Sequence, residues 1–158
     1  MAIHNPSLFG LLKNWVENNI FYSYKDAAQG LIIHRRQRFT IAEINAGASL
    51  LPALGASFKY RIVDVAVIAI GGAVTGATDV RVLGTRAAAS VALLVAAVAA
   101  LTQSALLRAG AANAVILADG ASFTALDANT AVTVGKTGAS AATATNVDVL
   151  ISYIVEKV

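Results

Sequence analysis

The feature of this chain that most constrains its fold is the uncharged run Ala87 to Leu107, which lies between two arginines. A membrane-spanning helix needs about 20 mostly apolar residues, so the run is long enough to cross a bilayer. Alanine dominates it, however, and polar residues such as Ser90 and Gln103 interrupt it, whereas spanning helices are carried mainly by larger apolar residues. We therefore favour a strand over Ser90 to Ala96, followed by a loop or short helix around Ala99 to Leu106. A small integral membrane protein is the alternative.

A second apolar run, Tyr60 to Ile70, predicts a long strand. It is apolar on both faces and only Arg61 and Asp64 break it, so we expect it in the middle of a sheet, packed on both sides or against a neighbouring subunit. A carboxylate inside an apolar stretch is expensive in hydrocarbon. This run therefore argues against a membrane span.

Further short strands are expected at intervals along the rest of the chain, separated by glycine-rich turns. The β-like segments are Ile41 to Leu54, Asp79 to Thr85, Ala114 to Ala118, Ala131 to Gly135 and Val147 to Val155, with a turn at Asp119-Gly120. In the last of them, apolar residues alternate with Asp148 and Ser152, which we place on the opposite face. This texture predicts a mainly β fold, a jelly-roll-like antiparallel β-sandwich over residues 31–158.

Composition narrows the function classes. Charged residues make up 13% of the chain, about half the usual share in soluble domains, which indicates either a membrane span or a surface that is largely hidden against partners. The chain has no cysteine, which excludes disulfides, thiolate zinc sites and cysteine nucleophiles. The fold must therefore be held by packing, and we expect association to contribute.

Positive charge is concentrated in the first part of the chain, and its densest point is Arg35, Arg36 and Arg38. Arginine clusters are typical of phosphate and nucleic-acid binders. This cluster is short and is flanked by Ile33, Phe39 and other apolar residues, so we interpret it as the solvated or partner-facing side of a strand. We therefore predict no nucleic-acid partner.

Residues 1–30 form a separate N-terminal arm. Asn5 followed by Pro6 is a typical helix start, and apolar residues then recur at helical spacing, which predicts a short amphipathic helix. The only tryptophan and several other aromatic residues lie in this arm, and aromatic residues are enriched in interface hot spots. The residues expected to anchor a partner are Leu11, Leu12, Trp15, Phe21, Tyr22 and Tyr24. A helix that packs on its own domain is the alternative.

Motifs of catalysis and of metal or cofactor binding are sparse. Gly135-Lys136-Thr137 resembles the end of a phosphate-binding loop, but Thr130 stands where that motif needs a glycine, so we interpret it as a turn after a strand. His4 and His34 have no neighbouring ligands at metal-site spacing. No nucleophile elbow marks a serine. We predict no cofactor and no metal, and we expect that the protein is not an enzyme.

Several sequence segments, taken in order, resemble the head decoration (cement) proteins of tailed bacteriophages. The likeness covers roughly residues 40–158, and the segments that carry it are Phe58 to Val65, Ile68 to Gly72, Asp79 to Thr85, Leu101 to Gln103, Ala118 to Phe123 and Asp148 to Val155. The resemblance implies a β-sandwich that trimerises on the outer surface of the capsid of the virion and binds the major capsid protein. It does not cover the arm. Given this resemblance, we expect Arg35, Arg36 and Arg38 to meet an acidic capsid surface.

On this resemblance we expect a viral structural protein that stabilises the capsid lattice without making or breaking bonds. A tail or fibre component of a phage would share the same β-rich texture and is the nearest alternative. Deleting residues 1–30 is expected to leave a folded, trimeric core that no longer occupies capsids.

Overall fold

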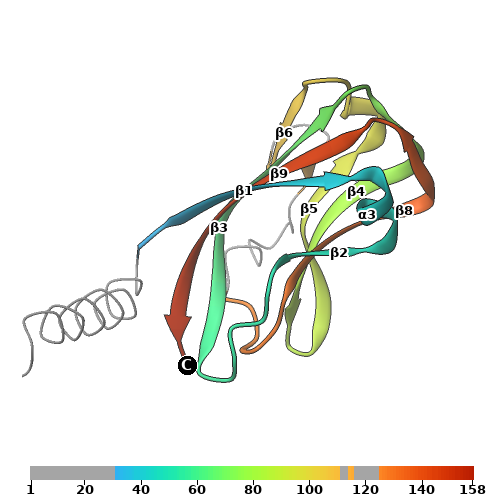
Figure 1. Ribbon diagram of the computed structural model, residues 1–158. Helices are drawn as coiled ribbons and strands as arrows, with labels where there is room; N and C mark the ends of the chain where they lie inside the picture. Colours follow the sequence, from blue (N-terminus) through green and yellow to red (C-terminus); the bar gives the residue numbers. More distant parts are fainter. Residues whose placement is uncertain (1–30, 111–113, 116–124) are drawn as a thin grey trace, which may run out of the picture.

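A computed structural model describes residues 31–110, 114–115 and 125–158. These residues form two antiparallel sheets packed face to face, with one short α-helix at the side (Figure 1). The prediction of a mainly β sandwich is therefore confirmed at this level. The expected arm helix and the turn at Asp119-Gly120 lie outside the described residues.

One sheet, sheet A, has the strand order β1-β9-β3-β6, and the other, sheet B, has the order β2-β8-β4-β5-β7. The strands of sheet A are β1 (Ile33–Thr40), β9 (Asn146–Lys157), β3 (Phe58–Ile70) and β6 (Leu106–Arg108). Those of sheet B are β2 (Ala48–Leu51), β8 (Val132–Thr143), β4 (Val74–Arg86), β5 (Ala89–Ala97) and β7 (Ala114–Val115).

The strand pairs are nested along the chain. The first strand pairs with the last (β1 with β9), and β2 pairs with β8, β3 with β6 and β4 with β5. Consecutive strands β1 and β2 lie in different sheets, as do β3 and β4. The described strands therefore follow the pairing of one long hairpin, and the further pairs β3 with β9 and β4 with β8 join them into the two sheets.

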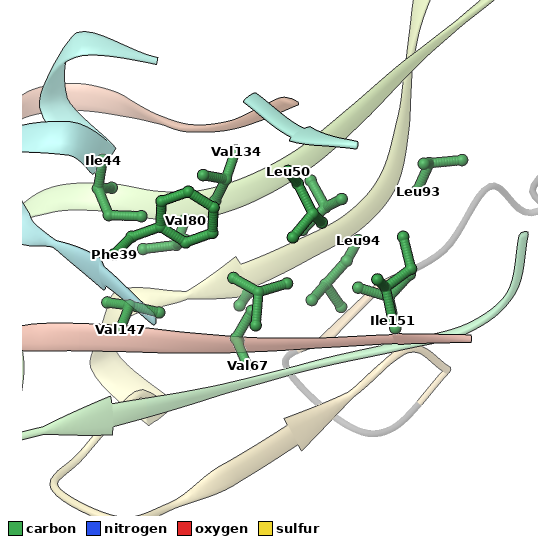
Figure 2. Packing of buried hydrophobic residues seen from close by; sticks show 14 of the residues in the cluster. Phe39, Ile44, Leu50, Val67, Val80, Leu93, Leu94, Val134, Val147 and Ile151 are labelled. Atoms are coloured by element: carbon green, nitrogen blue, oxygen red, sulfur yellow. The ribbon is translucent and has the colours of Figure 1, made fainter. Parts of the chain in front are cut away.

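The hydrophobic core fills the space between the two sheets (Figure 2). Its largest fully buried side chains include Phe39, Ile44, Leu50, Leu93, Leu94 and Ile151. Strand alternation supplies them, because every second residue of a strand points to the same face. In β9, for example, Val147, Val149 and Ile151 are buried in this core.

The uncharged run Ala87 to Leu107 forms neither a long helix nor a single strand. It supplies β5, a 3-10 turn η2 (Val98–Ala100) and most of β6, so it passes from sheet B to sheet A. Its apolar content is explained by burial, since Leu93, Leu94 and Leu101 are 1% exposed or less. Among the described residues, no helix is long and apolar enough to span a membrane.

Two local predictions were wrong. The segment Ile41 to Leu54, expected to be β-like, begins with helix α3 (Ile41–Ala46) before β2. Thr40 and Glu43 form a capping box at its start, and Gly47 ends it in the left-handed conformation at φ 79°. The segment Gly135-Lys136-Thr137 lies inside β8 and is not a turn, because β8 continues to Thr143 in pairing with β4.

Candidate partner-binding surface

The three arginines expected to act together lie on opposite faces of β1, an edge strand of sheet A. Arg36 and Arg38 are on the outer face, which points away from the core. Arg35 is paired with the core residue Ile151 and so lies on the inner face, where its guanidinium donates to Gln37 Oε1 at 2.7 Å. Strand alternation explains the separation, because adjacent residues point to opposite faces.

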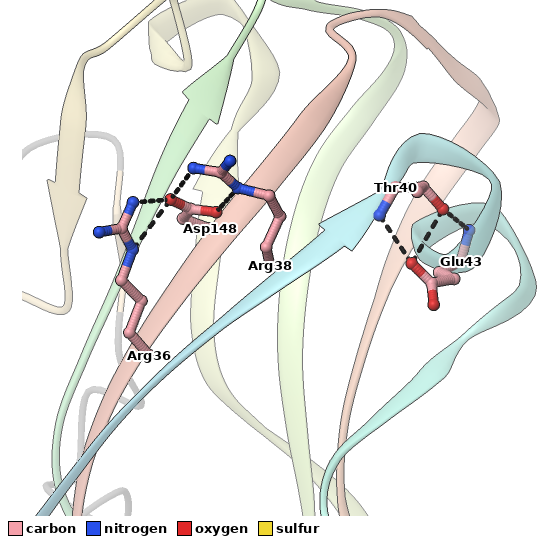
Figure 3. Close-up of polar contacts among 5 residues, drawn as sticks. All are labelled: Arg36, Arg38, Thr40, Glu43 and Asp148. Atoms are coloured by element: carbon pink, nitrogen blue, oxygen red, sulfur yellow. Dashed lines mark hydrogen bonds and ion pairs between the residues drawn. The ribbon is translucent and has the colours of Figure 1, made fainter.

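Arg36 and Arg38 converge on one carboxylate, that of Asp148 in the neighbouring strand β9 (Figure 3). Arg38 donates through Nε to Oδ1 at 2.7 Å and through Nη2 to Oδ2 at 3.0 Å. Arg36 donates to Oδ2 through Nε at 3.0 Å and also through Nη2. We call these three residues the Asp148 cluster.

Burial within the Asp148 cluster is unequal. The Asp148 side chain is 0% exposed, whereas those of Arg36 and Arg38 are 60% and 53% exposed. The hydrogen bonds from Arg38 hold the pKa of Asp148 below its ordinary value of 3.8, and those from Arg36 add to this effect against the opposing effect of burial. Asp148 therefore stays ionised and holds two largely exposed guanidinium groups in place.

Three cross-strand rows of side chains run over the outer face of sheet A. A register shift in β3 between Ile62 and Asp64 brings even-numbered residues of that strand to this face. The first row is His34, Ser152 and Asp64; the second is Arg36, Leu150, Ala66 and Arg108; the third is Arg38, Asp148, Ile68 and Leu106. His34 Nδ1 and Ser152 Oγ are 2.8 Å apart, and Arg108 Nε donates to Asp64 Oδ2 at 2.8 Å.

A hollow of about 470 Å³ is lined by all residues of the first and second rows, and its polar lining includes His34 and Ser152, which are hydrogen-bonded to each other. Ala66 and Leu150 contribute to its floor, and Arg36 and Arg108 line its two ends. Leu106 stands at its rim and is 56% exposed. The hollow exists because alanine is short while its neighbours along the row are long.

The outer face of sheet A, taken as a whole, is basic around an apolar centre. Its charged residues in the described strands are Lys59, Arg61, Asp64, Arg36, Arg38, Arg108, Asp148 and Glu156. Five are basic and three are acidic, a net charge of +2. Ion pairs join Arg61 to Glu156 and Arg108 to Asp64, so these two arginines, like Arg36 and Arg38, have carboxylate partners on this face.

The structure brings two of the nine predicted interface residues, Arg36 and Arg38, onto the outer face of sheet A. The side chain of Arg35 belongs to the inner face, although this residue also contributes to the lining of the hollow. The other six, Leu11, Leu12, Trp15, Phe21, Tyr22 and Tyr24, lie outside the described residues. Asp148 and Arg108 were missed. The alternation of β9 had placed Asp148 correctly on the outer face, but nothing in the sequence paired it with arginines more than 100 positions away.

Within the described part of the chain, no group of three histidine or acidic side chains is arranged to hold a metal ion. The described buried side-chain nitrogen and oxygen atoms all have hydrogen-bond partners. Comparisons with protein-family models, with curated proteins and with solved structures found no match for this chain.

Proposed function

We propose that this protein is a capsid decoration (cement) protein of a tailed bacteriophage, which binds the outer surface of the head and stabilises the lattice of the major capsid protein. The observation that carries the proposal furthest is the outer face of sheet A. It is a β-sheet face with an apolar centre, a net charge of +2 and arginines that are paired with carboxylates. Protein interfaces have this anatomy, with an apolar core and enrichment in arginine.

The finer fold assignment is part of the same proposal: we infer that the sandwich is a jelly roll. The nested pairing of β1 with β9, β2 with β8, β3 with β6 and β4 with β5 supports it. A jelly roll combines eight strands and two Greek keys in two sheets, and it is common in viral capsid proteins. The short strand β7 would be an addition at the edge of sheet B.

Stabilisation of the capsid lattice would follow from binding of this protein alone. A subunit that binds the assembled lattice and not the free capsid subunits makes disassembly harder by mass action. The low charge content of the chain and the apolar centre of the outer face of sheet A suit a protein that is in permanent contact with other subunits. A closed homotrimer is the proposed assembly, since closed symmetric oligomers are the usual solution for such chains.

The test is occupancy of capsids that lack the protein, measured by co-sedimentation of the purified full-length chain. We expect saturable binding that weakens as salt is raised, because arginine–carboxylate contacts at a surface are screened. Light scattering on a size-exclusion column is expected to give the mass of a trimer. Label on tails or fibres of intact virions, with none on heads, would refute the capsid assignment and favour a tail or fibre component.

A matched pair of variants separates contact by sheet A from unspecific charge attraction. Arg108→Gln removes one exposed positive charge from the outer face of sheet A, and Lys136→Gln removes the positive charge of a half-buried residue of β8 in sheet B. Only the first is expected to lower the affinity for capsids. Equal loss in the two variants would show that net charge alone drives binding, and would exclude sheet A as the contact.

A further inference from the structure

The hollow on sheet A is lined by arginines whose hydrogen-bond donors are only partly used by the described residues. Neighbouring strands lie about 4.8 Å apart, so Arg36 and Arg108 at the two ends of a four-strand row have Cα atoms about 14 Å apart. Between them, Leu150 and Ala66 offer a short apolar floor. This arrangement is an apolar trough with a cation at each end.

Both arginines keep donors that no described residue accepts from. Arg36 uses Nε and Nη2 for Asp148, which leaves its Nη1 group. Arg108 uses Nε for Asp64, which leaves both terminal nitrogens. A guanidinium has five N–H donors in a planar fork that matches a carboxylate, so each end of the trough can bind a further acidic group.

The floor discriminates among anions. Ala66 and Leu150 offer no hydrogen bonds from their side chains, and the exposed Leu106 at the rim gains by being covered. Asp64 also lines the hollow and repels a ligand that carries high negative charge. A single carboxylate on an aliphatic stem therefore fits better than a phosphate group.

We propose that this hollow is a binding site for a glutamate side chain of the protein partner, with its methylene groups over Ala66 and Leu150 and its carboxylate on the free donors of Arg108 or Arg36. The proposal rests on the proposed function in one respect, that the partner is the capsid surface. The site itself is defined by this chain alone, so it can be tested with a small probe.

The probe is N-acetyl-glutamate α-amide, titrated into the full-length protein while the Nε–Hε signals of the arginines are followed by nuclear magnetic resonance. Blocked glutamine, which differs only in the side-chain amide, and inorganic phosphate are the control ligands. We expect blocked glutamate to shift the signals of Arg36 and Arg108 with a Kd of the order of 10 mM. Blocked glutamine is expected to leave them unmoved, and phosphate to act at least tenfold more weakly.

Two variants test the site by different changes, one to its charge and one to its volume. Arg108→Gln removes one cation whose side chain is 66% exposed, so the fold tolerates it. Ala66→Leu fills the hollow without changing any charge. Each is expected to weaken blocked glutamate at least tenfold, and Lys136→Gln, on the other sheet, is expected to leave its affinity unchanged.

The outcomes separate the site from the function. Equal shifts with blocked glutamate and blocked glutamine, or none with either, would overturn the glutamate site even if the wild-type protein occupies capsids. Phosphate binding as tight as that of glutamate would overturn it as well. Specific glutamate binding that both variants remove supports the site, and wild-type protein that then fails to occupy capsids would overturn the proposed function alone.

Discussion

Removing Asp148 and removing its two arginine partners are expected to destabilise the protein by unequal amounts, although both break the same ion pairs. The difference comes from burial, because the Asp148 side chain is 0% exposed and those of Arg36 and Arg38 are 60% and 53% exposed. In Asp148→Asn, water can solvate the two arginines and the amide fills the same volume. With hydrogen bonds to charged groups contributing about 1.5–3 kcal/mol each before such compensation, we expect a loss of about 2 kcal/mol.

The double variant Arg36→Gln/Arg38→Gln leaves the Asp148 carboxylate buried without an ionic partner. Such a group costs about 3–5 kcal/mol. Protonation sets a limit, because neutralising a carboxyl of ordinary pKa 3.8 at pH 7 costs about 4 kcal/mol at 1.36 kcal/mol per pH unit. We therefore expect a loss of about 4 kcal/mol, roughly twice that of Asp148→Asn.

The decisive comparison is Asp148→Asn in the two backgrounds. It is expected to destabilise the wild-type protein and to stabilise the double arginine variant, because there it removes an unpaired buried charge. Urea unfolding at pH 7, followed by far-ultraviolet circular dichroism and analysed with a common m-value, measures each free energy of unfolding. If Asp148→Asn destabilises both backgrounds by the same amount, burial of the carboxylate does not govern the Asp148 cluster and the reasoning is refuted.

Three further outcomes are expected. The pKa values of Asp148 and Asp79 are lowered in the folded state. The stability that these two carboxylates contribute is therefore present above the ordinary pKa of 3.8 and is lost as the pH falls through their folded pKa values. The urea concentration at the unfolding midpoint should drop between pH 5 and pH 3, and it should drop less steeply in Asp148→Asn. Thr40→Ala removes the N-cap of α3 and should cost about 1 kcal/mol, as measured by urea unfolding; no change would mean that the capping box is not formed. A Cβ at position 84 would lie 2.7 Å from Leu126 Cδ1, so Gly84→Ala should cost about 1–3 kcal/mol, and Leu126→Ala should cost less in that background than in the wild-type protein, as tested by a double-mutant cycle.

The strands β3 and β9 were predictable from the sequence because their patterns are strong and local, whereas the second half of β8 was not. Tyr60 to Ile70 was expected in the middle of a sheet, and β3 (Phe58–Ile70) lies between β9 and β6. The sequence did not show why both faces of this strand are apolar. The register shift between Ile62 and Asp64 moves the outward-facing residues from odd-numbered to even-numbered positions. When a pattern with period 2 changes phase within a strand, apolar residues occur at both odd and even positions, so both faces of the strand look apolar in the sequence.

The candidate surface was only partly predictable, because it depends on pairings between distant positions. Arg36 and Arg38 were singled out from their density in the sequence, and a row of cross-strand neighbours adds Arg108 from β6. Their shared partner Asp148 is more than 100 positions from both. Strand alternation predicts the face of a residue, but it does not identify which strands will be neighbours.

Asp148 has two opposite effects on the face that we propose to bind an acidic partner, and the proposed function can be probed through their difference. It removes one unit of positive charge, which weakens the attraction. It also holds Arg36 and Arg38 in place through four hydrogen bonds. Immobilising a side chain costs about 0.5–1.5 kcal/mol of conformational free energy, and for these two arginines that free energy is lost when the protein folds and not when it binds.

If pre-ordering of the arginines dominates, Asp148→Asn should lower the affinity for capsids even though it makes the face more basic. With two arginines released, the expected loss is about 1–3 kcal/mol, or roughly 5-fold to 150-fold in Kd. Binding of the folded variant to capsids, compared with the wild-type protein at two salt concentrations, measures it. An increase in affinity for Asp148→Asn that disappears at high salt would show that charge alone governs docking, and would refute a role for the buried carboxylate in pre-ordering the arginines.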